Sequence, residues 1–162
     1  MNSLATIAAT AGTRLKERRQ TVAVVETSGG GLVSAALLAL PGASAYYRGG
    51  VVSYTAAARD AFLGTDATFL AGTRSSTEEC ALRLARTVRE RLGTTWAVAE
   101  TGAAGPTGNR YGDAAGHTCV AVSGPVERSL TVETRVADRE ANMWMFTRAA
   151  IGLLTDCIEA AK

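Results

Sequence analysis

Apolar positions along the chain alternate between helical spacing and short unbroken runs. Helical spacing over residues 4–15 predicts a first helix, and the β-branched run 21–25 (TVAVV) is typical of a buried strand. Residues 32–40 (LVSAALLAL) are apolar nearly all round and predict a buried helix that ends at Pro41-Gly42. The chain therefore begins in the order helix, strand, glycine loop, helix.

The middle of the chain continues this alternation. We expect a second strand at 50–54 (GVVSY) and a short helix at 56–63, which Gly64 ends. Ser76 and Glu79 form a capping-box pattern, which predicts a longer helix up to residue 92. Its buried face is expected to consist of Ala81, Leu84, Ala85, Val88 and Leu92.

The last third of the chain predicts three more strands and a long helix. Residues 96–100 (WAVAE) precede a glycine-rich loop, and 117–123 and 129–135 are expected to pair as an antiparallel hairpin. Asp138 can cap the final helix. Its inward residues are expected to be Met143, Phe146, Ala150, Leu153, Cys157 and Ile158. Helices interleaved with strands, without a repeat or an interior linker, predict a single layered α/β domain over residues 1–162.

Composition and charge narrow the class of protein. The 162 residues carry 17 Lys and Arg against 15 Asp and Glu, a formal charge of +2, which gives no reason to expect nucleic acid as a partner. Charged residues interrupt every long apolar stretch, so we expect no transmembrane helix. The three cysteines are isolated from one another, which argues against a zinc site and for reduced, buried thiols in a cytoplasmic compartment.

Two glycine loops that follow expected strands are candidate ligand sites. Residues 26–31 (ETSGGG) and 101–108 (TGAAGPTG) combine glycines with hydroxyls, and in an open α/β sheet such strand ends form the ligand crevice. The helix beginning near Gly31 would present free N–H donors to a phosphate or an oxyanion. Because neither loop has the P-loop or GxGxxG pattern, a phosphate site and tight structural turns both stay open as interpretations.

Reactive side chains near these loops are numerous. The candidate nucleophiles are the hydroxyls of Thr27, Ser28, Ser44, Ser53 and Thr101. His117 is the only His, and since the chain has no GxSxG elbow we expect it to be structural. Glu26 and Glu100 each end a strand beside a glycine loop, where they could act as acid and base or orient backbone amides.

Residues 24–64, VVETSGGGLVSAALLALPGASAYYRGGVVSYTAAARDAFLG, carry a family resemblance. They resemble the C-terminal domain of the competence/damage-inducible CinA family, whose pattern is close to AESCTGGLLAxxLTxxPGSSxxFxGGxVxYsNxxKxxLLG. The loop 101–108 resembles the family's TGxAGPxGG, the strand from Gly116 its GTVxxAV, and Asp138-Arg139 its GDR. The resemblance covers nearly the whole chain and implies a three-layer α/β/α fold with a mixed sheet, in the stand-alone form of the domain.

The resemblance also implies nicotinamide mononucleotide amidohydrolase activity, which yields nicotinic acid mononucleotide and ammonia, with no metal and no cofactor. In the family a serine of the first glycine loop is thought to attack the carboxamide carbon. A lysine after the Tyr-x-Asn turn removes the serine's proton, and nearby hydroxyls steady the oxyanion. We expect a small-molecule nucleotide as partner and assembly into a homo-oligomer, with neither nucleic acid nor membrane involved.

Carried over residue by residue, these roles meet substitutions at the reacting centre. The nucleophile position falls on Thr27, beside Ser28, and the lysine position falls on Arg59. Ser44 and Thr101 retain family hydroxyls. Because a guanidinium stays protonated at any working pH, Arg59 can hold an anion but cannot take a proton from Thr27. The expected substrate-binding residues are Glu26, Gly29, Gly30, Gly31, Tyr54, Gly102, Gly105 and Arg139.

Three functions remain compatible with the sequence. The retained hydroxyls favour an amidase that uses Thr27 or Ser28 as nucleophile and another group or a water as base. The substitutions at Thr27 and Arg59 favour instead a nucleotide-binding or sensing module that has lost the chemistry. In a structural or assembly protein, Trp144 and Met145, both expected to be exposed, would form part of a subunit contact.

Overall fold

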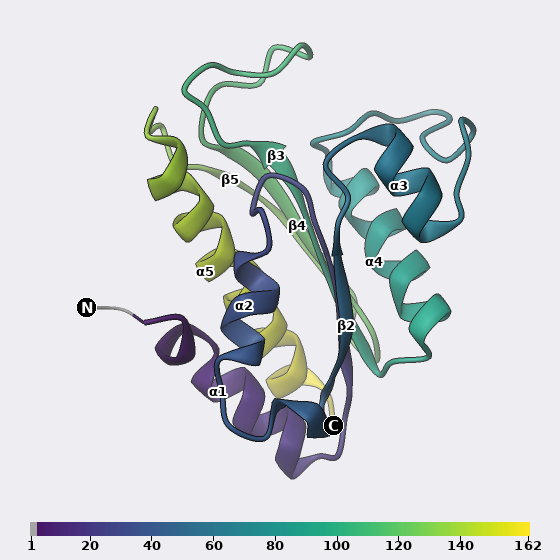
Figure 1. Cartoon of the computed structure of the whole chain (residues 1–162), viewed down its shortest axis with the longest axis vertical. Helices are drawn as coiled ribbons and strands as arrows, with labels where there is room; N and C mark the ends of the chain where they lie inside the picture. The colour runs from purple at the N-terminus through teal and green to yellow at the C-terminus, as the bar shows by residue number, and fades with distance from the viewer. Residues whose placement is uncertain (1–2) are drawn as a thin grey trace.

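A five-stranded sheet between two layers of helices forms the architecture of this computed structural model, which describes residues 3–162 (Figure 1). β1 pairs in parallel with β2 and β3, whereas β4 pairs antiparallel with both β3 and β5, in the order β2-β1-β3-β4-β5. The mixed α/β/α architecture implied by the resemblance is confirmed. The strands are β1 (Val22–Glu26), β2 (Tyr47–Val52), β3 (Trp96–Ala103), β4 (His117–Ser123) and β5 (Arg128–Glu133).

The helices cover both faces of the sheet, with α1, α2 and α5 on one side and α3 and α4 on the other (Figure 1). Each face of the sheet has its own hydrophobic core, and side chains of β1 alternate between the two. Val22 and Val24 pack in one core, and Ala23 and Val25 pack in the other. The helices are α1 (Leu4–Glu17), α2 (Leu32–Leu38), α3 (Ala56–Leu63), α4 (Glu78–Leu92) and α5 (Arg139–Ala160), with a 3-10 turn at Ala43–Ala45.

Local capping chemistry sets the ends of the helices. The Thr55 hydroxyl accepts the Ala58 N–H at 3.1 Å to begin α3, and Gly64 ends it at a φ of +63°, as expected. Asp138 caps α5, also as expected. The expected capping box at Ser76 is wrong, because Thr77 caps α4 and Ser76 adopts a φ of +59° that takes it out of the helix.

Two strand boundaries differ from the expectation. β2 begins at Tyr47 and ends before Tyr54, because its pairing with β1 starts at Val22 opposite Tyr47 and runs through Gly49 and Gly50. β3 continues to Ala103, because it stays paired with β4 as far as Ala103 opposite His117. The second glycine loop therefore starts later than its composition indicates.

Three expectations about side-chain burial are wrong. Leu38 is 53% exposed, so α2 has a solvent face, and Leu92 at the end of α4 is 45% exposed. Trp144 is half-buried, which leaves only Met145 of the pair exposed.

The three cysteines are buried and unpaired. No helix within residues 3–162 has the length and apolar character needed to span a membrane.

Candidate functional site

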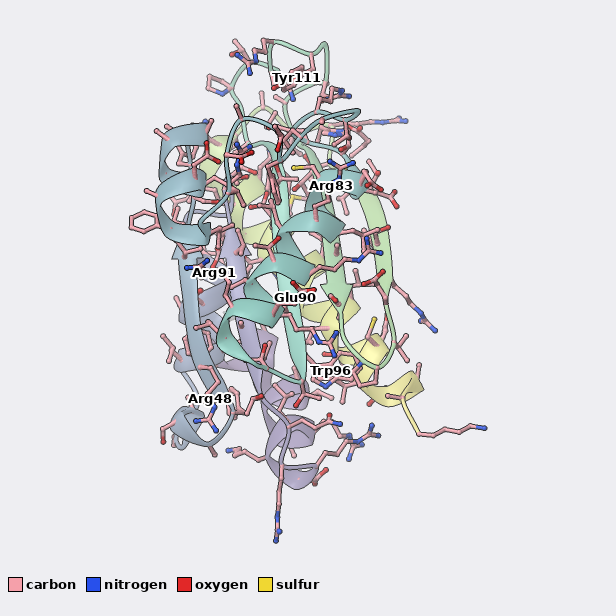
Figure 2. All side chains as sticks on the ribbon, turned by 90° about the vertical axis from the view of Figure 1, so that its right-hand side faces the viewer. Arg48, Arg83, Glu90, Arg91, Trp96 and Tyr111 are labelled. Atoms are coloured by element: carbon pink, nitrogen blue, oxygen red, sulfur yellow. The ribbon has the colours of Figure 1, made fainter. Side chains whose placement is uncertain are left out.

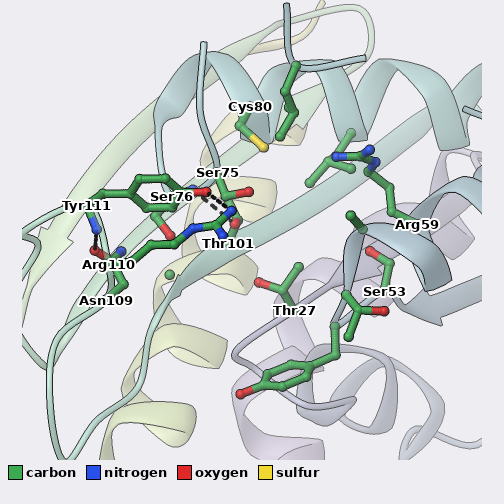
Figure 3. A pocket seen from close by; sticks show the side chains of 16 residues that line it. Thr27, Ser53, Arg59, Ser75, Ser76, Cys80, Thr101, Asn109, Arg110 and Tyr111 are labelled. Carbon is green, nitrogen blue, oxygen red and sulfur yellow. Dashed lines mark hydrogen bonds between the residues drawn. The ribbon is translucent and has the colours of Figure 1, made fainter. Parts of the chain in front are cut away.

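A pocket of about 500 Å³ lies where β1, β2 and β3 reach their carboxyl ends (Figure 3). Thr27 and Ser53 follow β1 and β2, and Thr101 lies on β3. Residues from α3, from α4 and the segment before it, and from the loop between β3 and β4 complete its walls. Pockets of roughly 300–1,000 Å³ are typical of small-molecule sites. The pocket is where an open α/β sheet is expected to bind its ligand.

The buried carboxylate of Glu100 fixes the turn that carries Thr27. Its Oε2 accepts the backbone N–H of Gly29 at 2.7 Å and that of Thr27 at 3.2 Å, and its Oε1 accepts the hydroxyls of Ser28 and Thr118. Burial raises the pKa of Glu100, and these hydrogen bonds oppose that rise. Ser28 is thus directed at a buried carboxylate and does not line the pocket.

Glu26 occupies the N-terminus of α2. Its Oε2 accepts the N–H groups of Gly31 at 2.9 Å and Val33 at 3.1 Å, and its Oε1 accepts that of Ser34 at 2.8 Å. The expectation of free donors near Gly31 for a phosphate is therefore wrong, because a carboxylate of the chain already satisfies them. Of the two roles considered for Glu26 and Glu100, the orientation of backbone amides is the one that these contacts show.

Thr27 and Ser53 both line the floor of the pocket, at the ends of β1 and β2 (Figure 3). Ser53 donates its N–H to the Glu26 carbonyl at 2.8 Å, which places it beside the start of the Thr27 turn. The Thr27 hydroxyl donates to the Glu100 carbonyl at 3.3 Å. Ser53 Oγ is buried without a hydrogen-bond partner among residues 3–162. Because a buried unpaired hydroxyl costs about 1–3 kcal/mol, this atom marks a place for a polar ligand group.

Arg59 lines the pocket from α3, but its charge is compensated. Its Nε and Nη2 contact Asp60 Oδ1 at 2.9 Å and 2.7 Å, and its guanidinium lies 5.0 Å from the ring centroid of Phe69. Its Nε also donates to the hydroxyl of Thr65 at 3.3 Å. These contacts hold Arg59 as a fixed wall of the pocket, and no contact joins it to Thr27.

A chain of hydrogen bonds from His117 to Thr101 positions the wall that precedes α4. His117 donates from Nε2 to the Ser76 carbonyl at 2.9 Å, and the Ser76 N–H donates to Thr101 Oγ1 at 3.3 Å. The other ring nitrogen of His117 bonds to Glu133. Burial disfavours the imidazolium, but the bonds to Glu133 and Ser76 and the charge of Asp113 outweigh it and raise the pKa of His117. The structural role expected for His117 agrees with these contacts.

Arg139 joins two segments at the mouth of the pocket. Its Nη1 donates to the Gly105 carbonyl at 2.5 Å, and its Nη2 donates to the Tyr54 hydroxyl at 3.1 Å. Tyr54 lines the pocket, whereas Gly105 and Arg139 do not. Both of the latter therefore support the site from outside it.

The structure brings together only part of the predicted site. Ser44 lies outside it, exposed on the 3-10 turn before β2, at the opposite end of the sheet from Thr27. Glu26 and the glycines 29–31 support the Thr27 turn from behind, and none of them lines the pocket. The predicted residues that do line the pocket are Thr27, Ser53, Tyr54, Arg59, Thr101 and Gly102.

Sequence reasoning missed the pocket wall formed by Leu70, Ser75, Ser76 and Cys80. The segment before α4 has no periodic pattern, and the sequence predicts Ser76 only as a helix cap. Burial raises the pKa of the Cys80 thiol to about 11, so Cys80 contributes an unreactive surface. No cluster of three or more potential metal-ligating side chains occurs within the described part of the chain.

The fold and the pocket define a three-layer α/β protein with a small-molecule crevice at the strand ends. Comparison with known families gives a match to the CinA C-terminal domain over residues 4–158. The chain belongs to this family. It is 36% identical to a CinA-like protein of Salinibacter ruber over 146 residues, which is 90% of this chain and 35% of the relative.

Other relatives give the same result. A CinA-like protein of Synechocystis is 36% identical over 86% of this chain and 34% of the relative, so the chain spans about a third of the length of these curated relatives. Among solved structures, competence damage-inducible protein A of Klebsiella pneumoniae superposes with a TM-score of 0.91 at 25% identity, over 99% of this chain and 100% of that one. The competence/damage-inducible protein CihA of Agrobacterium tumefaciens gives 0.86 at 25% identity, over 97% and 96%.

Proposed function

We propose that this protein is a nicotinamide-nucleotide amidohydrolase that converts nicotinamide mononucleotide and water to nicotinic acid mononucleotide and ammonia. The observation that carries the proposal is that the Thr27 hydroxyl and the buried, unpartnered Ser53 hydroxyl line the floor of the same pocket. A carboxamide both donates and accepts hydrogen bonds without a charge, so it suits this end of the pocket. The buried free thiols of the chain fit the reducing, cytoplasmic compartment that we also propose for it.

In this mechanism Thr27 Oγ1 attacks the carboxamide carbon, and the oxyanion that forms accepts a hydrogen bond from Ser53. The only hydrogen-bond partner of the Thr27 hydroxyl among residues 3–162 is a backbone carbonyl, so a water must carry its proton to the amide nitrogen. The C–N bond breaks and ammonia leaves. A second water then hydrolyses the threonyl ester, which releases the carboxylate product and restores Thr27.

A second candidate is a nucleotide-binding or sensing module without turnover. The Arg59–Asp60 ion pair favours it, because the position of the family lysine holds a compensated cation that cannot act as a base. Under this alternative the same pocket would bind the nucleotide and release it unchanged.

Ammonia release from nicotinamide mononucleotide, with mass-spectrometric detection of the acid product, distinguishes the two. We expect Thr27→Ala to abolish turnover and Thr27→Ser to retain it, because serine keeps the attacking hydroxyl. Thr13→Ala, an exposed change on α1, is the matched control and should behave as the unmodified protein. Product formation that survives Thr27→Ala would rule out this nucleophile. Absence of turnover together with stabilisation by the nucleotide would favour the sensing module.

A further inference from the structure

The two arginines that line the pocket differ in how their charges are balanced. Arg59 is paired with Asp60, as described above. Arg110, on the loop between β3 and β4, forms no ion pair with any carboxylate of residues 3–162, and its Nη2 donates only to the Tyr111 hydroxyl at 2.9 Å. Arg110 is therefore the uncompensated cation of the described pocket.

The loop around Arg110 holds its guanidinium in place. The guanidiniums of Arg74 and Arg110 each lie 5.0 Å from the centroid of the Tyr111 ring. Arg74 is anchored in turn by Asp113, at 2.6 Å and 3.0 Å. These contacts keep the Arg110 fork ordered before any ligand arrives, which reduces the entropy that binding must overcome.

The tip of the loop is braced by Asn109. Its Oδ1 accepts the N–H groups of Tyr111 at 3.0 Å and Asp113 at 3.1 Å, and its Nδ2 donates to Asp113 Oδ2 at 2.8 Å. Arg74 lowers the pKa of Asp113 to about 2, so this anchor stays ionised across the neutral range. The side chain of Arg110 extends from this braced tip into the pocket (Figure 3).

The pocket is therefore polarised. One side has a free guanidinium beside the uncharged hydroxyl groups of Ser75 and Thr101, and the floor has the uncharged hydroxyls of Thr27 and Ser53 (Figure 3). A guanidinium fork matches the oxygens of a phosphate monoester through two parallel N–H···O bonds. The α2 N-terminus, the alternative anion site, is already occupied by Glu26.

We propose that Arg110, braced by Tyr111 and Asn109, is the phosphate-recognition residue of this pocket, and that the ligand is a phosphomonoester whose uncharged end reaches Thr27 and Ser53. The identification of that uncharged end as a carboxamide rests on the proposed function. Recognition of the phosphate does not, because it depends on Arg110 alone.

The test compares nicotinamide mononucleotide with nicotinamide riboside, which lacks the phosphate, in the full chain and in Arg110→Ala and Arg110→Lys. For Arg110→Ala we expect KM for the mononucleotide to rise at least about tenfold with kcat within about twofold, and kcat/KM for the riboside to stay unchanged. Arg110→Lys should recover part of the loss, because it restores the charge but not the fork. Arg48→Ala is the matched control, since exposed Arg48 lies at the end of the sheet opposite Tyr111 (Figure 2).

Ligand-induced thermal stabilisation by the mononucleotide, the riboside and inorganic phosphate separates this proposal from the proposed function. Stabilisation by the mononucleotide that Arg110→Ala removes, without any turnover, would support phosphate recognition while refuting the amidase. If Arg110→Ala lowers the turnover of the mononucleotide and of the riboside equally, or changes neither, phosphate recognition is refuted and the amidase proposal stands. Equal stabilisation by mononucleotide and riboside, or none by either, would likewise overturn it.

Discussion

The amide nitrogen of Gly29 lies 2.7 Å from Glu100 Oε2, although 71 positions separate the two residues in the chain. Parallel pairing of β1 with β3 makes the contact, because it brings the ends of both strands to the same edge of the sheet. The Glu100 carboxylate accepts the backbone N–H groups of Thr27 and Gly29. The position of the Thr27 hydroxyl therefore depends on a side chain from another strand.

Replacing Glu100 with Gln tests this dependence. Both carboxylate oxygens accept donors, so a glutamine NH2 would face either the N–H groups of Thr27 and Gly29 or the hydroxyls of Ser28 and Thr118. We expect Glu100→Gln to lower the free energy of unfolding by about 1–3 kcal/mol in urea titrations. Glu90→Gln, an exposed change on α4, is the control. Equal stability of the two variants would contradict the role of Glu100.

Gly29→Ala probes the same turn sterically. A Cβ at this position would lie 3.0 Å from Glu26 Oε2 and 3.1 Å from Glu100 Oε2, and both carboxylates are fixed by backbone donors. We expect a loss of about 1–3 kcal/mol in unfolding free energy. Gly152→Ala in α5 meets nothing within 4 Å and should instead stabilise by up to about 1 kcal/mol. An unchanged unfolding free energy for Gly29→Ala would show that the two carboxylates can move to make room for the added methyl group.

Stability should depend on pH through His117. Because its pKa is raised in the folded protein, its contribution is complete below the ordinary value of 6.5 and is lost as the pH rises through the folded pKa. The groups that face it are Asp113, Glu133, Cys119 and the Ser76 carbonyl. We expect the stability difference between the unmodified protein and His117→Gln to shrink as the pH rises above about 6.5 and through the raised pKa of His117.

Chemical denaturation at a series of pH values measures that difference. Glu133→Gln should reduce the dependence, because it removes one of the contacts that raise the pKa of His117. A difference that grows with pH would mean that His117 is buried in its neutral form.

Restoring a lysine at position 59 should require a second change. The Asp60 carboxylate lies against this side chain and would hold an ammonium in its protonated form. We therefore expect Thr27→Ser/Arg59→Lys/Asp60→Asn to release ammonia faster than Thr27→Ser/Arg59→Lys, by at most about tenfold for each unit by which the lysine pKa falls. Equal rates in the two combinations would show that Asp60 does not control the base.

Helices and strands could be predicted from the sequence where local signals, such as caps, determine their ends. α3 lies at the predicted residues because Thr55 begins it and Gly64 ends it, and both signals are local. The sequence predicts a start of β2 at Gly50 and not at Tyr47, because Gly49 lacks a β-branched side chain and pairing with β1 overrides that preference.

Only part of the candidate site could be predicted from the sequence, because the rest depends on contacts between distant segments. Thr27 and Thr101 follow from the glycine loops, since the carboxyl ends of neighbouring parallel strands must meet. Ser44 was misplaced because its position depends on the direction in which β2 enters the sheet. The pocket wall at Ser75 and Ser76 depends on hydrogen bonds of Ser76 with Thr101 and His117. A periodic pattern in the sequence does not predict such long-range contacts.

Occupation of the α2 N-terminus by Glu26 has an evolutionary consequence. An internal anion neutralises that helix end, so under the two proposals above the attraction for a ligand's charge comes from the loop between β3 and β4, while the attacking hydroxyl comes from the turn after β1. On these proposals, the reacting hydroxyl and the charge selectivity lie on two different segments, each of which can be replaced without the other. Exchange of the loop alone can retarget the crevice to differently charged ligands without disturbing the Thr27 turn.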